Sequence, residues 1–262
     1  LAIIRQCDAI IHIGRAYENN DIVHVADKVD PKDDIEVINT ELILADLQTI
    51  ETRLPKIQKE AKAKPSLKPA AEYLSKLVIH LQSGEPLSSP ANLNIDMIPD
   101  LHLLTAKPII YAFNVDEETL GNPQKQAELA SMVLPAKSVF VCAKLEEELK
   151  GLEETDAKEL LESYGVKETG LNQMIHSAYN TLGLQSYMTA GPKEVRAWTI
   201  HKGWTAPQAA GVIHTDFERG FIAAQVIDYN DLVECGSEQA AKQAGKVRTE
   251  GRDYIMQTNN VI

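Results

Sequence analysis

A polar tetrapeptide at residues 114–117, Asn-Val-Asp-Glu, has the residue types to recognise a nucleotide base. It follows a short apolar run, residues 109–113, which is typical of a strand buried on both faces of a parallel sheet. Ligands of open α/β sheets lie at the carboxyl ends of such strands, where these polar side chains would stand. A second apolar run, residues 138–143, ends before Lys144, so two strands would deliver polar groups to one edge of the sheet.

The spacing of these groups resembles the guanine-reading end of P-loop GTPases, with one departure. Asn114 and Glu117 form an Asn-x-x-Glu motif, and residues 142–144 read Cys-Ala-Lys. The usual fourth residue is an aspartate, whose carboxylate accepts hydrogen bonds from the N1–H and the exocyclic amine of guanine. Because glutamate is longer, its carboxylate is displaced and this bidentate fit is lost, so guanine preference should be weak. A purely structural interpretation is that Asn114 and Asp116 cap a helix that begins near Glu117.

The composition is that of a protein with one large or two modest cores. The 262 residues are 44% hydrophobic and 24% charged. No apolar run has the length of a membrane helix and no signal segment is recognised, so we expect a cytoplasmic protein without a membrane partner. The net charge of -12 disfavours indiscriminate nucleic-acid binding, and no DNA partner is expected.

Metal-binding and phosphate-loop motifs are not recognised in the sequence. The histidines have no partners at the spacing that a zinc site requires, and neither an HExxH motif nor a nucleophile elbow occurs. Gly245 and Lys246 lack the flanking residues of a phosphate-binding loop. We therefore predict no metal ligands and no catalytic residues within this sequence.

A long amphipathic segment predicts a helical hairpin. From Ile35 to about Lys64 the apolar residues recur in alternating steps of four and three, as in a coiled-coil seam, and Asp33 or Asp34 would be the N-cap. Two prolines then separate this helix from a second amphipathic helix that ends at Gly84. The predicted seam consists of Ile43, Leu47, Ile50, Leu54, Ile57 and Ala61.

The far end of the predicted hairpin concentrates positive charge in an acidic chain. The basic residues there are Arg53, Lys56, Lys59, Lys62, Lys64 and Lys68. Only Glu51 and Glu60 oppose them. One interpretation is a contact to RNA phosphate, and the other is a solvated tip that keeps the protein soluble.

The composition changes near Gln185 to short strands and turns. Strands are expected at residues 187–189, 195–201, 221–227 and 254–257, with helices near residues 206–213 and 237–245. This pattern predicts a separate α+β module of ubiquitin-like size that begins near residue 184.

Several segments together identify a family that the chain resembles. They include IIYAFNVDE at residues 109–117 and KEVRAWTIHKGWTAPQAAGVIHTDFERGF at residues 193–221. The chain is similar over nearly its whole length to the Obg-like ATPase family of the YchF type. The resemblance implies an α/β fold in which residues 1–34 and 101–183 form part of a P-loop NTPase (Rossmann-like) domain. Residues 35–100 would be an inserted antiparallel coiled-coil hairpin, and residues 184–262 an α+β ubiquitin-like TGS domain.

The resemblance also implies a function. Members are implied to bind and hydrolyse ATP in preference to GTP, with Mg²⁺ as cofactor. They are also implied to associate with the ribosome and to act in translation or stress regulation. In this chain the ribosome contact would be made to rRNA by the hairpin. The residues implied to surround the base are Asn114, Val115, Glu117, Cys142, Ala143 and Lys144. The alternative is a non-catalytic module that binds the ribosome or RNA through the coiled coil and the TGS domain.

The ends of the sequence depart from the family pattern. The Walker A loop, the switch segment and the Mg²⁺ ligands of family members would precede Leu1, and a final strand of the TGS domain would follow Ile262. Phosphoryl transfer depends on positioning the triphosphate and its metal. We therefore expect a fragment that is inactive alone.

Overall fold

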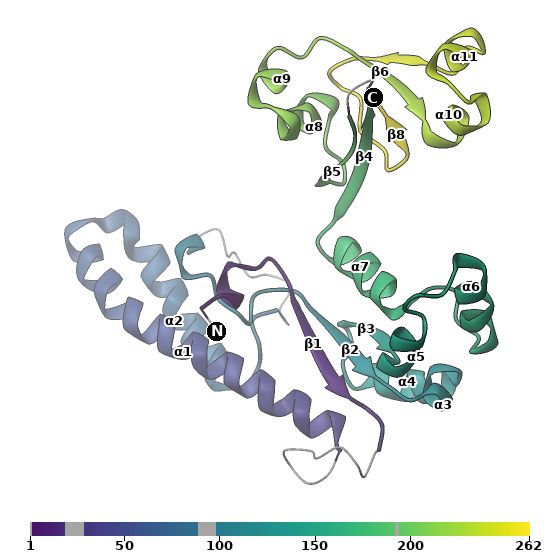
Figure 1. Cartoon of the computed structure of the whole chain (residues 1–262). Helices are drawn as coiled ribbons and strands as arrows, with labels where there is room; N and C mark the ends of the chain where they lie inside the picture. Colours follow the sequence, from purple (N-terminus) through teal and green to yellow (C-terminus); the bar gives the residue numbers. More distant parts are fainter. Residues whose placement is uncertain (1, 19–28, 89–97, 192–193) are drawn as a thin grey trace. The chain divides into compact units, whose positions relative to one another are not determined.

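The computed structural model describes the chain except for residues 1, 19–28, 89–97 and 192–193 (Figure 1). Parts of the predicted NTPase domain and of the predicted insertion therefore lie outside the described residues. The chain divides into two compact units, Leu1–Ala178 and Tyr179–Ile262. Within the described ranges, no helix is both long and apolar enough to cross a membrane.

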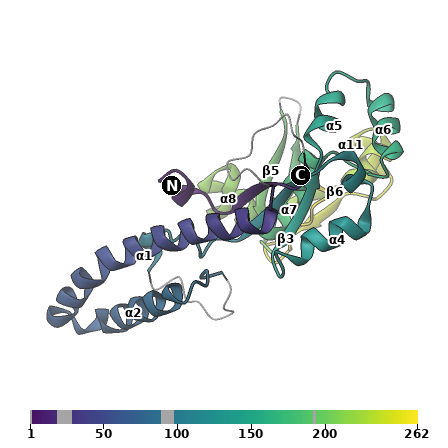
Figure 2. The same ribbon diagram turned by 90° about the horizontal axis from the view of Figure 1, so that it is seen from below.

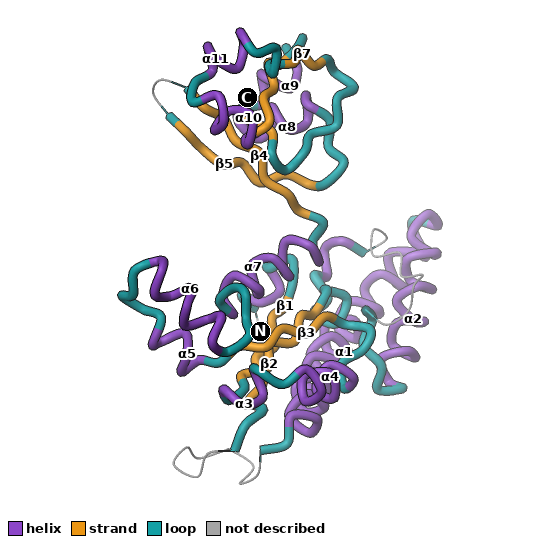
Figure 3. Tube along the Cα trace, turned by 90° about the vertical axis from the view of Figure 1, so that its right-hand side faces the viewer, coloured by secondary structure: helices purple, strands orange, loops and turns teal. Residues whose placement is uncertain are grey.

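Parallel strands form the sheet of the first unit in the order β1-β2-β3 (Figures 1 and 3). They are β1 (Ile10–Arg15), β2 (Ile109–Asn114) and β3 (Lys137–Val141). β2 lies between the other two strands, and its residues 110–113 are all buried, as the unbroken apolar run predicts. Asn114 pairs in register with Arg15 and with Val141, so the three strands end at one edge of the sheet.

A helical hairpin stands between β1 and β2 in the sequence, and its helices lie side by side (Figure 2). It consists of α1 (Pro31–Ala63), the 3-10 helix η2 (Pro65–Leu67) and α2 (Lys68–Gln82). The predicted N-cap at Asp33 or Asp34 is wrong, because Asp30 accepts hydrogen bonds from the amides of Lys32 and Asp33. Pro31 occupies the first turn, where a missing N–H costs nothing and a fixed φ favours the helix.

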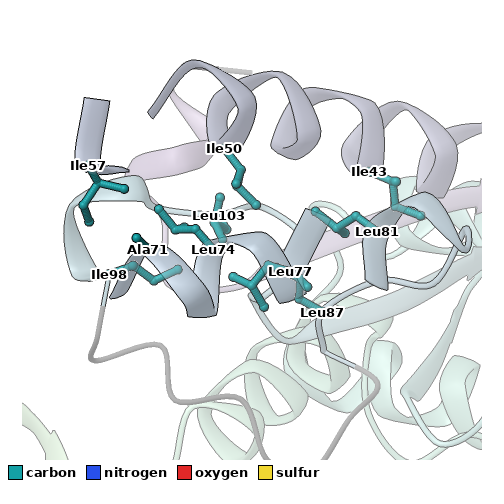
Figure 4. Close-up of a cluster of buried hydrophobic side chains, with 10 residues drawn as sticks. All are labelled: Ile43, Ile50, Ile57, Ala71, Leu74, Leu77, Leu81, Leu87, Ile98 and Leu103. Carbon is teal, nitrogen blue, oxygen red and sulfur yellow. The ribbon is translucent and has the colours of Figure 1, made fainter. Parts of the chain in front are cut away.

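The predicted seam of α1 faces α2 (Figure 4). Ile43, Ile50 and Ile57 recur every seven residues and are buried against leucines of α2. Ile50 and Leu74 are both 0% exposed, so truncating either to alanine should cost roughly 3 kcal/mol. Of the other predicted seam residues, Ala61 is buried and Leu47 and Leu54 pack at the margin of the cluster. The segment after α2 adds Leu87, Ile98 and Leu103.

A buried carboxylate ties the base of this hairpin to the segments that precede β1 and β2. Asp46 of α1 is 0% exposed, and one of its oxygens accepts hydrogen bonds from Arg5 Nη1 and the Leu104 amide, both at 2.9 Å. The other oxygen accepts from the amide and the hydroxyl of Thr105 at 2.7 and 2.8 Å. Arg5 also donates to the Ala45 carbonyl. Three segments of the chain therefore meet at one side chain.

Further helices complete the first unit. They are η1 (Ile4–Gln6), η4 (Pro99–Leu101), α3 (Glu117–Leu120), α4 (Pro123–Ser131), α5 (Ala143–Glu148), α6 (Glu154–Ser163) and α7 (Gly170–Thr181), which extends past the unit boundary. Phe113 and Val115 belong to a second core that includes Leu120, Leu145 and Leu161. Gly151 has a φ of +84° in the turn between α5 and α6, so the acidic residues 144–164 form two helices and not one.

The second unit contains a mixed sheet in the order β5-β4-β8-β6-β7 (Figure 1). Its strands are β4 (Leu184–Ala190), β5 (Val195–His201), β6 (Ala224–Asp228), β7 (Arg248–Glu250) and β8 (Asn260–Val261). Its helices are α8 (Ala206–Ile213), α9 (Thr215–Arg219), α10 (Tyr229–Cys235) and α11 (Glu238–Gln243). Tyr187 is buried against α8, and its hydroxyl donates to the Ala209 carbonyl at 2.9 Å.

One predicted strand of this unit is wrong. Residues 254–257 form no strand, and only Ile255 makes an isolated bridge with Thr205. The buried Asn260 side chain accepts hydrogen bonds from the Gln257 amide and the Tyr254 hydroxyl, which closes a turn over these residues. The short β8 that follows pairs with β4 and β6 instead.

Replacing Asp46 with alanine should destabilise the first unit by roughly 3 kcal/mol or more, because the substitution leaves buried amides and the Arg5 guanidinium without their acceptor. Chemical denaturation monitored by circular dichroism measures this loss. Glu41→Ala is the matched control, since Glu41 is an exposed acidic residue of the same helix. Equal losses for the two variants would contradict a structural role for Asp46.

Candidate functional site

A cavity of about 390 Å³ lies at the carboxyl edge of the first unit's sheet. Its lining comprises Tyr17, Glu18, Asn114, Val115, Asp116, Glu117, Cys142, Ala143 and Lys144. All six residues that the sequence resemblance places around a base are in this set. They meet because β2 and β3 are adjacent and parallel and end in register, so the loops that follow them are neighbours.

Asn114 joins the two loops. Its side-chain oxygen accepts a hydrogen bond at 3.2 Å from the amide of Ala143, the first residue of α5. This amide is one of the N–H groups that a helix cannot satisfy internally. The backbone reinforces the link, since the Val115 amide donates to the Val141 carbonyl at 2.8 Å. Asn114 therefore holds the loops in place and does not cap α3.

Asp116 has the capping role that the structural interpretation assigned to it. Its carboxylate accepts a hydrogen bond at 2.8 Å from the Thr119 amide at the start of α3. Hydrogen bonds from Thr119 lower the pKa of Asp116 below its ordinary value. The carboxylate is thus ionised at neutral pH and fixes the direction of the loop that precedes Glu117.

Glu117 and Lys144 form an ion pair across the cavity lining. The Lys144 ammonium lies 2.6 Å from Glu117 Oε1, and the two side chains are 70% and 31% exposed respectively. The hydrogen bond from Lys144 lowers the pKa of Glu117, and the same contact raises the pKa of Lys144. Both groups therefore stay charged at neutral pH, one as an acceptor and the other as a donor.

Val115 and Cys142 line the cavity although both residues are buried. Their side chains are 2% and 3% exposed and pack in the core of the first unit. Cys142 is a free cysteine in that core. Burial of these two residues anchors the loops that carry the half-buried Glu117 and the exposed Lys144.

Tyr17 and Glu18 line the cavity but were not predicted from the sequence. They follow β1, so the rule that ligands meet the carboxyl ends of parallel strands applies to them as well. The Arg15 guanidinium lies 4.8 Å from the centre of the Tyr17 ring, and Arg15 Nε donates to the Tyr17 carbonyl at 3.0 Å. Their position directly after a strand was the sequence signal that could have identified them as lining residues.

The basic tip of the hairpin is a separate surface, defined by Arg53, Lys56, Lys59, Lys62, Lys64 and Lys68. Its five lysines are exposed, whereas Arg53 Nη1 pairs with Glu60 Oε1 at 3.1 Å. A groove of about 250 Å³ lies between α1 and α2 at this end, and Lys62 and Lys68 are part of its lining. Among the described residues, the tip lysines show no ion pair.

Curated relatives align with the whole chain, and a family model matches its last part. The ribosome-binding ATPase YchF of Bacillus subtilis is 46% identical over 272 residues, and that of Haemophilus ducreyi is 45% identical over 267 residues. Both alignments cover 100% of this chain and 74% of the relative. A protein-family model described as YchF-GTPase_C, a protein of unknown function (DUF933), matches residues 184–262.

A solved structure is also similar. The YchF GTPase of Schizosaccharomyces pombe matches with a TM-score of 0.80 and 33% identity, covering 99% of this chain and 72% of that chain. The mixed α/β fold, with a polar cavity at the edge of a parallel sheet, therefore has the architecture of a nucleoside triphosphatase. The chain belongs to the YchF family.

Replacing Asn114 with alanine should speed hydrogen exchange of the Ala143 amide about fivefold, because one hydrogen bond worth roughly 1 kcal/mol is lost. Amide exchange followed by nuclear magnetic resonance measures this directly. Asn122→Ala is the control, since Asn122 caps α4 through the amides of Gln124 and Lys125. Unchanged exchange at Ala143 in the Asn114 variant would show that the two loops are held by other contacts.

Proposed function

We propose that this protein binds and hydrolyses ATP in preference to GTP, and that the cavity at the sheet edge receives the adenine base. The observation that carries this proposal is the meeting of Asn114, Glu117 and residues 142–144 around one cavity. The relatives' names, ribosome-binding ATPase YchF, support both the reaction and the partner. A role at the ribosome makes the cytoplasm the expected location and translation or stress regulation the expected process.

The length of the Glu117 side chain supports a preference for adenine. An aspartate can accept two hydrogen bonds from the N1–H and the exocyclic amine of guanine, whereas adenine offers an acceptor at N1 and an amine at C6. A glutamate carries its carboxylate farther from the backbone, and Lys144 already occupies one of its oxygens. The paired carboxylate is therefore poorly suited to the two donors of guanine.

Mg²⁺ is the metal proposed to accompany the bound ATP. Among the described residues, no three His, Cys, Asp or Glu side chains gather where a metal ion could bind. When bound, the metal neutralises charge on the phosphates. The cavity residues are proposed to contact only the base.

We assign the chain to three domains on the same grounds. Residues 1–34 and 101–183 would be part of the P-loop NTPase domain, residues 35–100 a coiled-coil insertion, and residues 184–262 a TGS domain. The position of the hairpin between the adjacent strands β1 and β2 supports the insertion. The family match at residues 184–262 supports the last boundary.

A second candidate function is ribosome or RNA binding without catalysis, through the hairpin and the second unit. The basic tip favours it, since its five exposed lysines lie at the end of the hairpin in an acidic protein and show no ion pair among the described residues. Lys56, Lys59 and Lys62 are spaced by three residues, so they follow one side of the last turns of α1. Contact with rRNA phosphate would use their charge and not a base sequence.

Glu117→Asp in the full-length protein should lower the ratio of ATP to GTP affinity about tenfold, because the shorter carboxylate can accept both guanine donors. Titration calorimetry with each nucleotide measures the ratio. Glu118→Asp is the control, since Glu118 pairs with Lys125 and does not line the cavity. An ATP to GTP affinity ratio that stays the same in both variants would contradict the proposed role of Glu117.

Changing Lys56, Lys59 and Lys62 together to glutamate should weaken ribosome binding, because phosphate contacts are lost. The slope of log affinity against log salt concentration should become shallower by roughly 2. Cosedimentation with ribosomes at increasing salt tests this. The control changes Lys150, Lys158 and Lys167 to glutamate, which alters the net charge equally but lies outside the basic tip. Equal behaviour of the two triple variants would assign the effect to net charge alone.

A further inference from the structure

One side of β5 has no neighbouring strand. β5 is the first strand in the order β5-β4-β8-β6-β7, so within the described part of the chain only β4 pairs with it (Figure 3). An edge strand presents N–H and C=O groups that another extended chain can bind, and proteins usually protect it with proline, lysine, a bulge or a very short strand. β5 has seven residues, contains neither proline nor lysine, and pairs with β4 at every residue without a bulge.

The hydrogen bonds of β4 with the last residue fix which backbone groups of β5 point outward. The Ile262 amide donates to the Met188 carbonyl at 2.9 Å, and the Ala190 amide donates to the Ile262 carbonyl at 3.0 Å. Met188 and Ala190 therefore direct their backbone groups away from β5. In an antiparallel pair the residues opposite them do the same, and the direction alternates along the strand. The outward residues of β5 are Val195, Ala197 and Thr199.

The side chains of β5 present different chemistry on the two faces of the sheet, because successive residues alternate. On one face, the Arg196 guanidinium lies 4.1 Å from the centre of the Trp198 ring, and the Arg196 side chain is 55% exposed. Glu194 Oε1 is 3.9 Å from Arg196 Nη1, which is too long for a hydrogen bond. The outward residues stand on the other face, where Val195 is 74% exposed. A strand added at this edge would meet a cation on one face and small or β-branched side chains on the other.

We propose that the outer edge of β5 binds an extended acidic segment of a partner protein, which adds an antiparallel strand to the sheet of the second unit. Main-chain hydrogen bonds to the outward residues supply affinity, and alternate side chains supply specificity. A carboxylate of the segment pairs with Arg196, and β-branched side chains pack against Val195 and Thr199 on the other face. This inference is independent of nucleotide binding in the cavity.

A short partner segment fits this edge better than RNA or a second copy of the chain. The outward N–H groups need acceptors and the outward C=O groups need donors, and another peptide backbone supplies both in alternation. Phosphate supplies acceptors alone. A second copy would bring a net charge of -12 against an equally acidic protein, whereas a short segment brings only its own carboxylates beside Arg196.

The test uses a synthetic heptapeptide of alternating valine and glutamate, with binding to the full-length protein measured by titration calorimetry. The valines are expected to lie opposite the outward residues, so their N–H groups donate to β5 and those of the glutamates do not. Methylation of the valine nitrogens should weaken binding about tenfold or more, because main-chain hydrogen bonds are lost. Methylation of the glutamate nitrogens should leave the affinity within about twofold, which makes this peptide the matched control.

Two variants test the protein side. Ala197→Pro removes an outward N–H and no bond to β4, so the sheet should persist while the peptide binds about tenfold more weakly. Arg196→Glu should also weaken binding of the valine–glutamate peptide about tenfold and favour a valine–lysine peptide instead. Arg219→Glu is the control, since it changes the charge equally at an exposed position on α9.

Every other outcome counts against the proposal. Equal affinities for the two methylated peptides, or no binding at about 1 mM peptide, would overturn it. Self-association of the wild type that Ala197→Pro abolishes would assign the edge to a second copy. Hexauridine binding that Arg196→Glu abolishes, without peptide binding, would assign the edge to RNA.

Discussion

The burial of one carboxylate constrains the architecture of the first unit. Asp46 has no exposure to solvent, so its charge must be compensated by protein groups. The structure supplies an arginine from the start of the chain and amides from the segment that precedes β2. Because these donors come from separate segments, only one rotation of α1 about its own axis places Asp46 within hydrogen-bonding distance of all of them. That rotation also turns Ile43, Ile50 and Ile57 toward α2.

The same segment links the hairpin to the cavity. Thr105 binds Asp46, and the chain then enters β2 at Ile109 and emerges at Asn114. The strand between them is buried, which limits the freedom of its end. Asn114 in turn holds the first residue of α5. The site is therefore positioned by a continuous series of packed and hydrogen-bonded elements that begins at the base of the hairpin.

The cavity combines rigid backbone with exposed charge. Val115 and Cys142 are buried and anchor the loops, while Glu117 and Lys144 remain accessible above them. Such a division suits the proposed base-binding role, since a supported backbone keeps the few polar side chains at defined positions. The hydrogen bond from Lys144 lowers the pKa of Glu117, which keeps the pair charged at neutral pH.

Local sequence patterns determined much of this protein. The unbroken apolar run of β2 predicted a parallel sheet, and the heptad spacing in α1 predicted a hairpin. The polar residues after β2 and β3 predicted a site at the sheet edge. These predictions were possible because each pattern reports the burial of its own segment. Pairings between distant residues were decided only by the tertiary structure. The Asp46 contacts, the approach of Lys144 to Glu117 and the place of β8 in the sheet depend on which segments meet, and a local pattern carries no record of the partner.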